Sequence, residues 1–166
     1  MASINGISLK SLKHFKDHEG MTIAQGNVYY NGKKLGFWSQ DSWGGGDRYD
    51  FDTKDLDTEA KKYAKSSHVK SEYKNIFNLD CLMYDLICLM DTEKSYKKGI
   101  KNGYRSYVEV TDGYHVFGYW SQVPNPTGLA KAEHKKFMDS IKDKLLKDKK
   151  PVVNVYNSDS DFVIAV

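Results

Sequence analysis

The sequence has little of what marks membrane, secreted or linker-rich proteins. Only 3 of its 166 residues are proline, and no low-complexity linker divides the chain. No segment approaches the roughly 18 consecutive apolar residues that a membrane span requires. The first residues also lack the apolar core of a secretory signal peptide. We therefore expect a protein of the cytoplasm that has no membrane contact.

Cysteine is equally scarce. The 2 cysteines, Cys81 and Cys88, fall in a segment that we expect to be helical. At about 1.5 Å per residue they would lie roughly 10 Å apart, beyond the Cα distance of about 7 Å that a disulfide allows. We expect reduced residues packed in the core. A thiol nucleophile assisted by His68, His115 or His134 is not favoured in such surroundings.

Apolar residues are present in the amount that a folded domain needs. Hydrophobic residues make up 40% of the chain and aromatic residues 13%, and the formal net charge is only +3. This composition supports a hydrophobic core and argues against disorder. We predict a single α+β domain over residues 1–166, with a β-rich N-terminal lobe at 1–53 and helices and a further hairpin at 54–166.

A five-residue pattern, Gly-aromatic-Trp-Ser-Gln, occurs at 36–40 and again at 118–122. Each copy follows a tight-turn dipeptide, Asn31-Gly32 or Asp112-Gly113, that favours a β-hairpin. We therefore predict hairpins over 21–40 and 104–122. Two interpretations of the pattern stay open: its glycine permits close packing, or its Trp is an exposed contact for another macromolecule.

The turn of the first hairpin also predicts its register. A two-residue turn at Asn31-Gly32 places Val28 opposite Leu35. Val28, Leu35 and Phe37 would then face the core. Trp38 would point to the opposite face of the hairpin, away from the core.

Apolar periodicity predicts most of the other elements. The strongest predicted helix spans Asn75–Met90, and we expect it to be central and buried because apolar residues cover most of its circumference. Asp57 or Thr58 would cap a shorter helix, and Asn102-Gly103 would end another. The further predicted segments are strands at 7–12, 49–51, 152–156 and 162–166, and helices at 57–66, 91–101 and 128–147.

Acidic side chains are concentrated between residues 41 and 59. This segment carries seven acids against Arg48 and Lys54, a net charge of −5. Asp50 and Asp52 would share one face of a strand, and such carboxylates could hold Mg²⁺ or Ca²⁺. The EF-hand spacing is absent, so a solvated or partner-facing acidic surface is favoured. We expect no metal and no cofactor.

Two other groups resemble fragments of known sites. His14, His18 and Glu19 lie close in sequence, but zinc needs three or four ligands and the His-Glu-x-x-His spacing is missing. We expect a solvated turn there. The glycine run at 44–46 lacks the Gly-Lys-Ser/Thr ending of a phosphate loop. It would act as a flexible turn that lets Trp43 approach Trp38 or a partner.

Lysines suggest an alternative function in nucleic-acid binding. The predicted helix at 128–147 and the residues after it project lysines beside an apolar face. Next to exposed aromatic rings, these side chains would contact phosphates while the rings stack on bases. Acids such as Asp139 and Asp143 interrupt the basic run, which favours a solvated face. The candidate nucleic-acid-binding residues are Lys131, Lys135, Lys142 and Lys149.

Two stretches carry a resemblance to a known group of proteins. Residues 18–34 and 36–45, the latter Gly-Phe-Trp-Ser-Gln-Asp-Ser-Trp-Gly-Gly, resemble the start of small proteins encoded by bacteriophages and mobile elements of Gram-positive bacteria. Residues 93–104, from Glu93 to Tyr104, are similar to the same set. The resemblance implies an accessory phage protein, a class in which anti-CRISPR and other anti-defence inhibitors are common. It implies no catalytic residues.

We therefore expect a non-enzymatic, phage-type protein that binds and inhibits a host defence nuclease, such as a CRISPR effector, in the bacterial cytoplasm. Its acids would compete with nucleic acid for a basic groove. The alternatives are a nucleic-acid-binding module and a small metal-dependent hydrolase using Asp50 and Asp52 or His14 and His18. A homodimer is compatible with the aromatic surface. The predicted partner-binding residues are Trp38, Trp43, Asp47, Tyr49, Asp50, Asp52 and Trp120.

Overall fold

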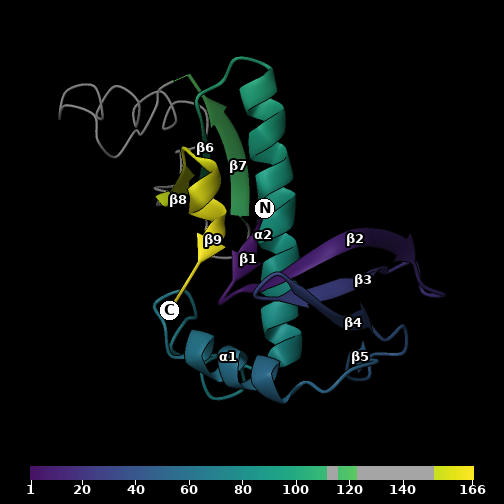
Figure 1. Ribbon diagram of the computed structural model, residues 1–166. Coiled ribbons are helices and arrows are strands. Elements are labelled where there is room, and N and C mark those ends of the chain that lie inside the picture. The colour runs from purple at the N-terminus through teal and green to yellow at the C-terminus, as the bar shows by residue number, and fades with distance from the viewer. Residues whose placement is uncertain (112–115, 123–151) are drawn as a thin grey trace. The chain divides into compact units, whose positions relative to one another are not determined.

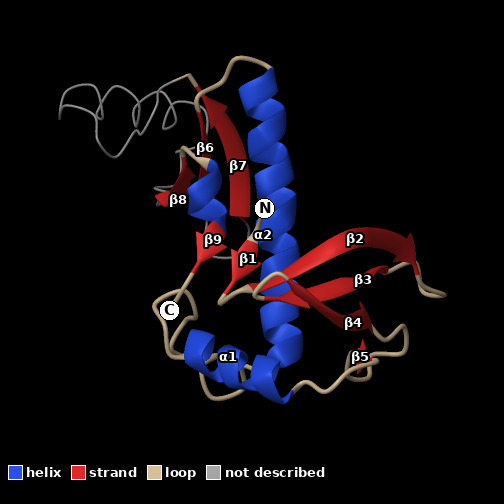
Figure 2. Cartoon of the chain, viewed as in Figure 1, coloured by secondary structure: helices blue, strands red, loops and turns tan. Residues whose placement is uncertain are grey.

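The computed structural model describes residues 1–111, 116–122 and 152–166. The chain divides into two compact units: unit 1 comprises residues 1–90 and 163–166, and unit 2 comprises residues 91–162. Helices and largely antiparallel strands occur in the same chain (Figure 2), which confirms the predicted α+β class.

Unit 1 is built on a six-stranded sheet with the order β5-β4-β3-β2-β1-β9 (Figure 1). Neighbouring strands are antiparallel except β1 and β9, which pair in parallel. The strands are β1 (Ser3–Ile4), β2 (Ile7–Lys16), β3 (Thr22–Tyr30), β4 (Lys33–Ser39), β5 (Arg48–Tyr49) and β9 (Val163–Ile164). The predicted edge strand at 7–12 is thus longer, and the final strand is shorter than predicted.

Asn-Gly turns make two of the hairpins of this sheet, β1–β2 and β3–β4. Asn31 and Gly32 have φ values of 48° and 80°, and Asn5 and Gly6 have φ values of 48° and 79°. A two-residue turn with both residues at positive φ matches the twist of antiparallel strands, and Asn followed by Gly tolerates it best. The predicted turn at 31–32 is confirmed, and the same dipeptide at 5–6 marks a hairpin that we did not predict.

The register between β3 and β4 differs from the prediction because of a β-bulge. Tyr30 lies opposite Lys33 as expected, but the register shifts between Val28 and Tyr29, so that Val28 faces Gly36 instead of Leu35. A shift of one residue exchanges the two faces of a strand. The predicted core position of Phe37 is therefore wrong: its side chain is 39% exposed, while that of Trp38 is 0% exposed.

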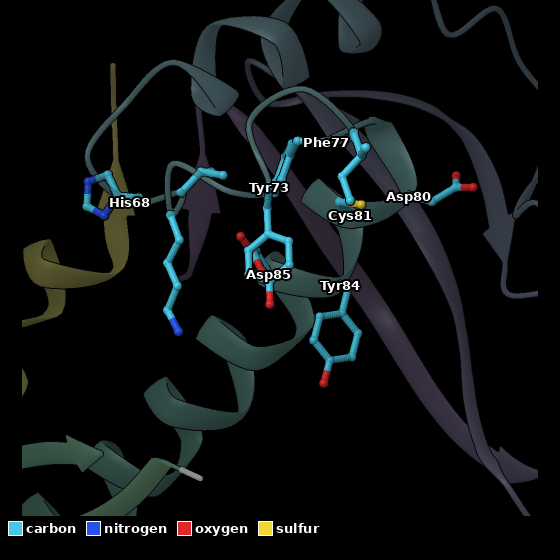
Figure 3. Close-up of a pocket in the computed structure, with 10 residues that line it drawn as sticks. His68, Tyr73, Phe77, Asp80, Cys81, Tyr84 and Asp85 are labelled. Atoms are coloured by element: carbon cyan, nitrogen blue, oxygen red, sulfur yellow. The ribbon is translucent and has the colours of Figure 1, made fainter. Parts of the chain in front are cut away.

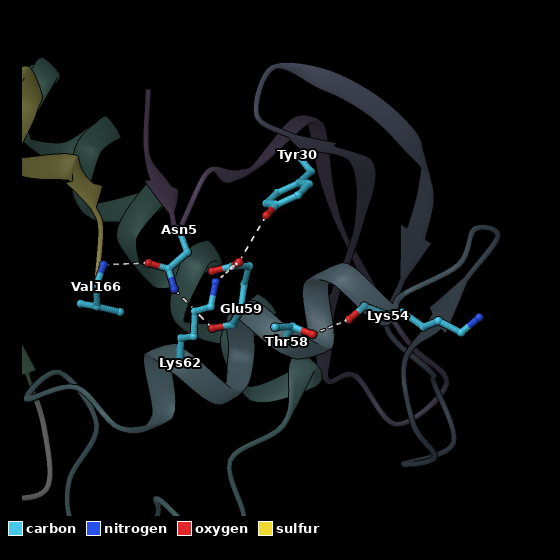
Figure 4. Close-up of polar contacts among 7 residues, drawn as sticks. All are labelled: Asn5, Tyr30, Lys54, Thr58, Glu59, Lys62 and Val166. Carbon is cyan, nitrogen blue, oxygen red and sulfur yellow. Dashed lines mark hydrogen bonds and ion pairs between the residues drawn. The ribbon is translucent and has the colours of Figure 1, made fainter.

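Helix α1 (Lys54–Ala64) starts one turn earlier than predicted, after the N-cap residue Thr53. It buries Leu56 and Ala60 in the core of unit 1. Its Glu59 is also buried, and a carboxylate oxygen accepts hydrogen bonds from the Tyr30 hydroxyl at 3.2 Å and from Lys62 at 2.7 Å (Figure 4). These contacts connect α1 to the end of β3.

Asn5 adds a second connection on the same side of α1 (Figure 4). Its amide nitrogen donates to the backbone oxygen of Glu59 at 3.3 Å. Its amide oxygen accepts a hydrogen bond from the backbone N–H of Val166 at 2.9 Å. One side chain in the β1–β2 turn thus binds both α1 and the residues that follow β9.

Helix α2 (Leu79–Lys101) is continuous across the predicted break at Asp91, and its residues belong to both units. It begins later than predicted because Asn78 acts as its N-cap: the Asn78 side chain accepts a hydrogen bond from the N–H of Cys81 at 3.0 Å. Ile76, which we expected on the buried helix, is 70% exposed. Gly103, with φ of 85°, ends the helix as predicted.

Unit 2 contains a three-stranded antiparallel sheet with the order β7-β6-β8. The strands are β6 (Ser106–Thr111), β7 (Val116–Ser121) and β8 (Val152–Tyr156), followed by a short 3-10 helix, η1 (Asp159–Phe162). Phe162 is fully buried and stacks on Tyr156 with ring centroids 4.6 Å apart. The predicted pairing of 104–111 with 114–122 is confirmed for the strands, whereas the predicted helix at 128–147 lies outside the described residues.

Candidate functional site

Trp38 is a core residue of unit 1, which corrects its prediction as an exposed contact. Its indole N–H donates to Oδ2 of Asp47 at 2.8 Å. The hydroxyl of Tyr49 donates to Oδ1 of Asp80 at 2.8 Å, and the backbone N–H of Asp47 donates to the other oxygen of Asp80 at 3.2 Å. Three of the predicted partner-binding residues thus form a network with Asp80, which lies in the first turn of α2.

This network fixes the segment between β4 and α1 rather than presenting a free acidic surface. Burial raises the pKa of Asp47 to about 6, with a further contribution from the negative charge of Asp80, while the hydrogen bond from Trp38 opposes the rise. Burial and the Asp80 carboxylate also raise the pKa of Tyr49. Both side chains are therefore structural members of unit 1.

The loop at 41–47 is organised around the carboxylate of Asp41. Its Oδ2 accepts the backbone N–H groups of Trp43 at 3.1 Å and Gly45 at 2.8 Å, and its Oδ1 accepts Arg48 at 3.2 Å. The hydrogen bond from Gly45 leads the interactions that hold the pKa of Asp41 below its usual value. The predicted flexible turn at 44–46 is therefore held at Gly45, and the loop is held a second time at the backbone of Trp43.

Trp43 projects from this organised loop. Its side chain is 76% exposed, the largest exposure among the big hydrophobic residues described. The indole stacks on the ring of His18, with centroids 4.1 Å apart and planes 30° from parallel. His18 lies in the β2–β3 turn, which is itself held by hydrogen bonds from the Glu19 and Met21 backbones to Asp17. Two ordered loops thus support one exposed aromatic pair.

Asp50 and Asp52 do not form the predicted pair on a strand, because β5 ends at Tyr49. Asp50 accepts a short hydrogen bond from the backbone N–H of Phe37. Asp52 accepts the N–H of Lys54 at 3.1 Å and forms an ion pair with its ammonium group at 3.1 Å. These contacts hold the pKa of Asp52 below its usual value. Each carboxylate therefore stabilises local backbone.

Trp120 packs within unit 2. Its indole N–H donates to the backbone oxygen of Ser95 at 2.9 Å, and its ring lies so close to Gly99 that a Cβ there would be 2.3 Å from the indole. Tyr104 stacks on it at a centroid distance of 5.8 Å. The side chain is 40% exposed, but these contacts give it a packing role on α2.

The histidines and cysteines form no catalytic or metal arrangement in the described part of the chain. His14 lies on β2, an exposed strand position, and not on a helical face with His18. No group of three or more potential metal ligands is found among the residues described. The predicted burial of the cysteines is wrong, since Cys81 is partly exposed and Cys88 is exposed.

A pocket that the sequence did not predict lies in unit 1, and its walls are formed by the segment that connects α1 to α2 and by the first turns of α2 (Figure 3). Its volume is about 520 Å³. The sequence offers one weak sign of this pocket. Large apolar or aromatic residues, Tyr73, Ile76 and Tyr84, stand before and within the first turns of α2 at positions that do not fit its buried face. All three are at least half exposed in the structure.

The lysines of the alternative interpretation, Lys131, Lys135, Lys142 and Lys149, fall outside the range that the structure describes. Within the described ranges, no helix is long and apolar enough to cross a membrane. No protein-family model matches the chain, and comparisons with curated proteins and with solved structures give no match either.

Proposed function

We propose that this protein acts by binding another protein, and that the 41–47 loop with Trp43 is its contact. The observation that carries the proposal is the exposure of Trp43 on a loop whose backbone is held by Asp41. Tryptophan is enriched among the residues that dominate binding energy. A loop that is already ordered loses less conformational entropy on binding, which favours affinity.

The proposed partner is a host defence nuclease, such as a CRISPR effector, which the protein would inhibit in the bacterial cytoplasm. Two observations support this choice. The stretches that resemble phage proteins include the whole 41–45 part of the loop. The segment at 41–59 has a net charge of −5, and although Asp47 and Glu59 are engaged in contacts within unit 1, other acids of the segment are exposed, namely Asp50, Asp52 and Asp55. An anionic surface of this kind complements the basic channels of nucleases.

The test is capture followed by reconstitution. Tagged protein is exposed to nuclease-treated lysate of a CRISPR-bearing Gram-positive host, and any stoichiometric nuclease is purified and titrated by calorimetry. Its cleavage of DNA is then measured with and without the protein. The variant Trp43→Ala should bind at least about tenfold more weakly, because hot-spot truncations cost about 2 kcal/mol or more.

Tyr73→Ala is the matched control, since Tyr73 is another exposed aromatic residue of unit 1. It should bind like the wild type. The proposal would be wrong if Trp43→Ala bound the nuclease as tightly as the wild type. It would also be wrong if no nuclease that the protein inhibits were captured. Capture of nucleic acid alone, with affinity that falls steeply as salt rises, would instead favour the lysine-based alternative.

A further inference from the structure

The pocket of unit 1 has the dimensions of a small-molecule site. Its volume of about 520 Å³ falls within the range of about 300–1,000 Å³ typical of ligand pockets. We call it the 68–85 pocket. The side chains that line it include Val69, Tyr73, Ile76, Phe77 and Tyr84. Most of its wall is therefore apolar or aromatic.

Three of the large side chains that line the 68–85 pocket are exposed to solvent. Tyr73 is 50% exposed, Ile76 is 70% exposed and Tyr84 is 61% exposed. Grouped exposure of large side chains is typical of sites that bind something, whereas scattered exposure is common on any surface. A ligand with an apolar body would cover these side chains.

One carboxylate, that of Asp85, lies in the pocket without a strong cationic partner. Among the described residues no Lys or Arg forms an ion pair with Asp85. The Tyr63 hydroxyl forms a hydrogen bond with it, and the exposed ring of His68, which stacks on Tyr63, lies near enough to influence it. Burial nevertheless raises the pKa of Asp85, because a charge in apolar surroundings is costly unless it is paired.

The second acid of the pocket is already engaged. Both oxygens of Asp80 accept hydrogen bonds, from the Tyr49 hydroxyl and from the Asp47 backbone. In Figure 3 its carboxylate points away from Tyr73 and Tyr84. Lys70, also at the pocket, is exposed, and its long side chain can keep the ammonium group in water. Asp85 is thus the acid that a ligand would meet.

We propose that the 68–85 pocket binds a small organic cation with an aromatic body, of the arylalkylamine class. Its ammonium group would pair with Asp85, and its ring would lie against Tyr73, Phe77 and Tyr84. Aromatic faces attract cations, so the walls and the carboxylate favour the same ligand charge. An anion would be repelled, and a neutral apolar ligand would leave Asp85 desolvated without compensation. The inference uses none of the residues of the Trp43 loop.

The test uses three probes of similar shape and different charge: phenethylamine, 2-phenylethanol and 3-phenylpropionate. Each is titrated into the full-length protein at neutral pH, and backbone amide shifts of residues 68–85 are followed by NMR. We expect phenethylamine to bind at least about tenfold more tightly than 2-phenylethanol, the preference that a paired charge and cation–π contacts supply. The propionate should bind most weakly.

Two variants locate the site. Asp85→Asn keeps an acceptor for Tyr63 and should abolish the preference for the amine over the alcohol. Tyr84→Ala removes an exposed ring, so it should leave the fold intact and weaken phenethylamine binding several-fold. Trp43→Ala is the control and should bind like the wild type. Equal binding of the alcohol and the amine, a preference that survives Asp85→Asn, or no shifts at millimolar probe would each overturn the proposal.

Discussion

The indole N–H of Trp38 reaches from the core of unit 1 to Oδ2 of Asp47, at a distance of 2.8 Å. Trp38 is fully buried, so its donor needs a partner that the surrounding apolar side chains cannot supply. Asp47 supplies it from the end of the 41–47 loop that carries Trp43. The contact therefore joins the core to the base of the proposed binding loop, and it makes the loop sensitive to changes in either residue.

Asp47 should make stability depend on pH in an unusual direction for an acid. Its folded-state pKa is about 6, above the ordinary value of 3.8, so the folded state retains a proton that the unfolded state has released. Protonation of Asp47 therefore adds to the free energy of unfolding below about pH 4, and this contribution is lost as pH rises through about 6. Asp47→Asn cannot titrate and should escape this loss.

The measurement is urea denaturation of the wild type and Asp47→Asn across this range. The free energy of unfolding of the variant, relative to that of the wild type, should rise by about 1 kcal/mol from pH 4 to pH 7. This is less than the whole difference between the folded and unfolded pKa values of Asp47 corresponds to, because Asp47 is partly solvated. Asp52→Asn is the control: because the pKa of Asp52 is lowered from 3.8, its contribution to stability changes only below about pH 4, and its difference from the wild type should stay nearly constant from pH 4 to pH 7. A constant difference between Asp47→Asn and wild type would contradict the expectation.

The bulge in the first hairpin predicts opposite outcomes for two neighbouring aromatic residues. Trp38→Ala should lower the free energy of unfolding by about 3–5 kcal/mol, the cost of emptying a buried aromatic site. Phe37→Ala should cost about 1 kcal/mol or less, because its side chain is already substantially exposed. Urea denaturation followed by circular dichroism measures both. A larger cost for Phe37→Ala would support the register predicted from the turn alone.

The turn residues of this hairpin could be predicted from the sequence, but its faces could not. Asn31 and Gly32 both tolerate the positive φ values that the turn requires, so the dipeptide alone predicts the turn. The bulge has no comparable signal in the sequence of the hairpin, because the residues packed against it come from a later segment of the chain. Gly36 has room only for a hydrogen: a Cβ would be 2.2 Å from Asp50 and 2.7 Å from the Phe51 ring. Those contacts come from a segment more than ten residues later.

The repeated Gly-aromatic-Trp-Ser-Gln pattern shows the same limit. The packing interpretation accounts for both glycines, because a Cβ on Gly118 would be 1.6 Å from the Tyr107 hydroxyl. The two tryptophans then differ: Trp38 is buried in unit 1, and Trp120 packs on α2 in unit 2. The most exposed Trp, Trp43, stands outside the pattern. Side-chain exposure depends on tertiary contacts that a local pattern does not contain.

Gly99 and Trp120 should be strongly coupled in stability. A Cβ at Gly99 would be 2.3 Å from the indole, so Gly99→Ala forces one of them to move. We expect a loss of about 1–3 kcal/mol, typical of overpacking. In a Trp120→Ala background the clash is gone, and the same substitution should be neutral or stabilising by up to about 1 kcal/mol from helix propensity.

A double-mutant cycle with urea denaturation gives the coupling directly. Gly103→Ala is a useful contrast within the same helix end: it meets no atom within 4 Å, but its φ of 85° makes alanine strained. Its cost should therefore be the same with and without Trp120. Additive effects of Gly99→Ala and Trp120→Ala would show that the indole does not pack on Gly99.

The Asn5 side chain should stabilise the contact between the β1–β2 turn and Val166. Asn5→Ala removes the hydrogen bonds to the Glu59 and Val166 backbones and also places alanine at a φ of 48°, which costs about 1–2 kcal/mol for a residue with a Cβ. Asn5→Gly removes the same hydrogen bonds without this strain. The difference in unfolding free energy between the two variants should therefore report this strain, reduced by the larger conformational entropy that glycine loses on folding. Hydrogen exchange of the Val166 amide reports the hydrogen bond: both variants should accelerate it equally, and protection that survives in Asn5→Gly would mean that the amide is held by something other than Asn5.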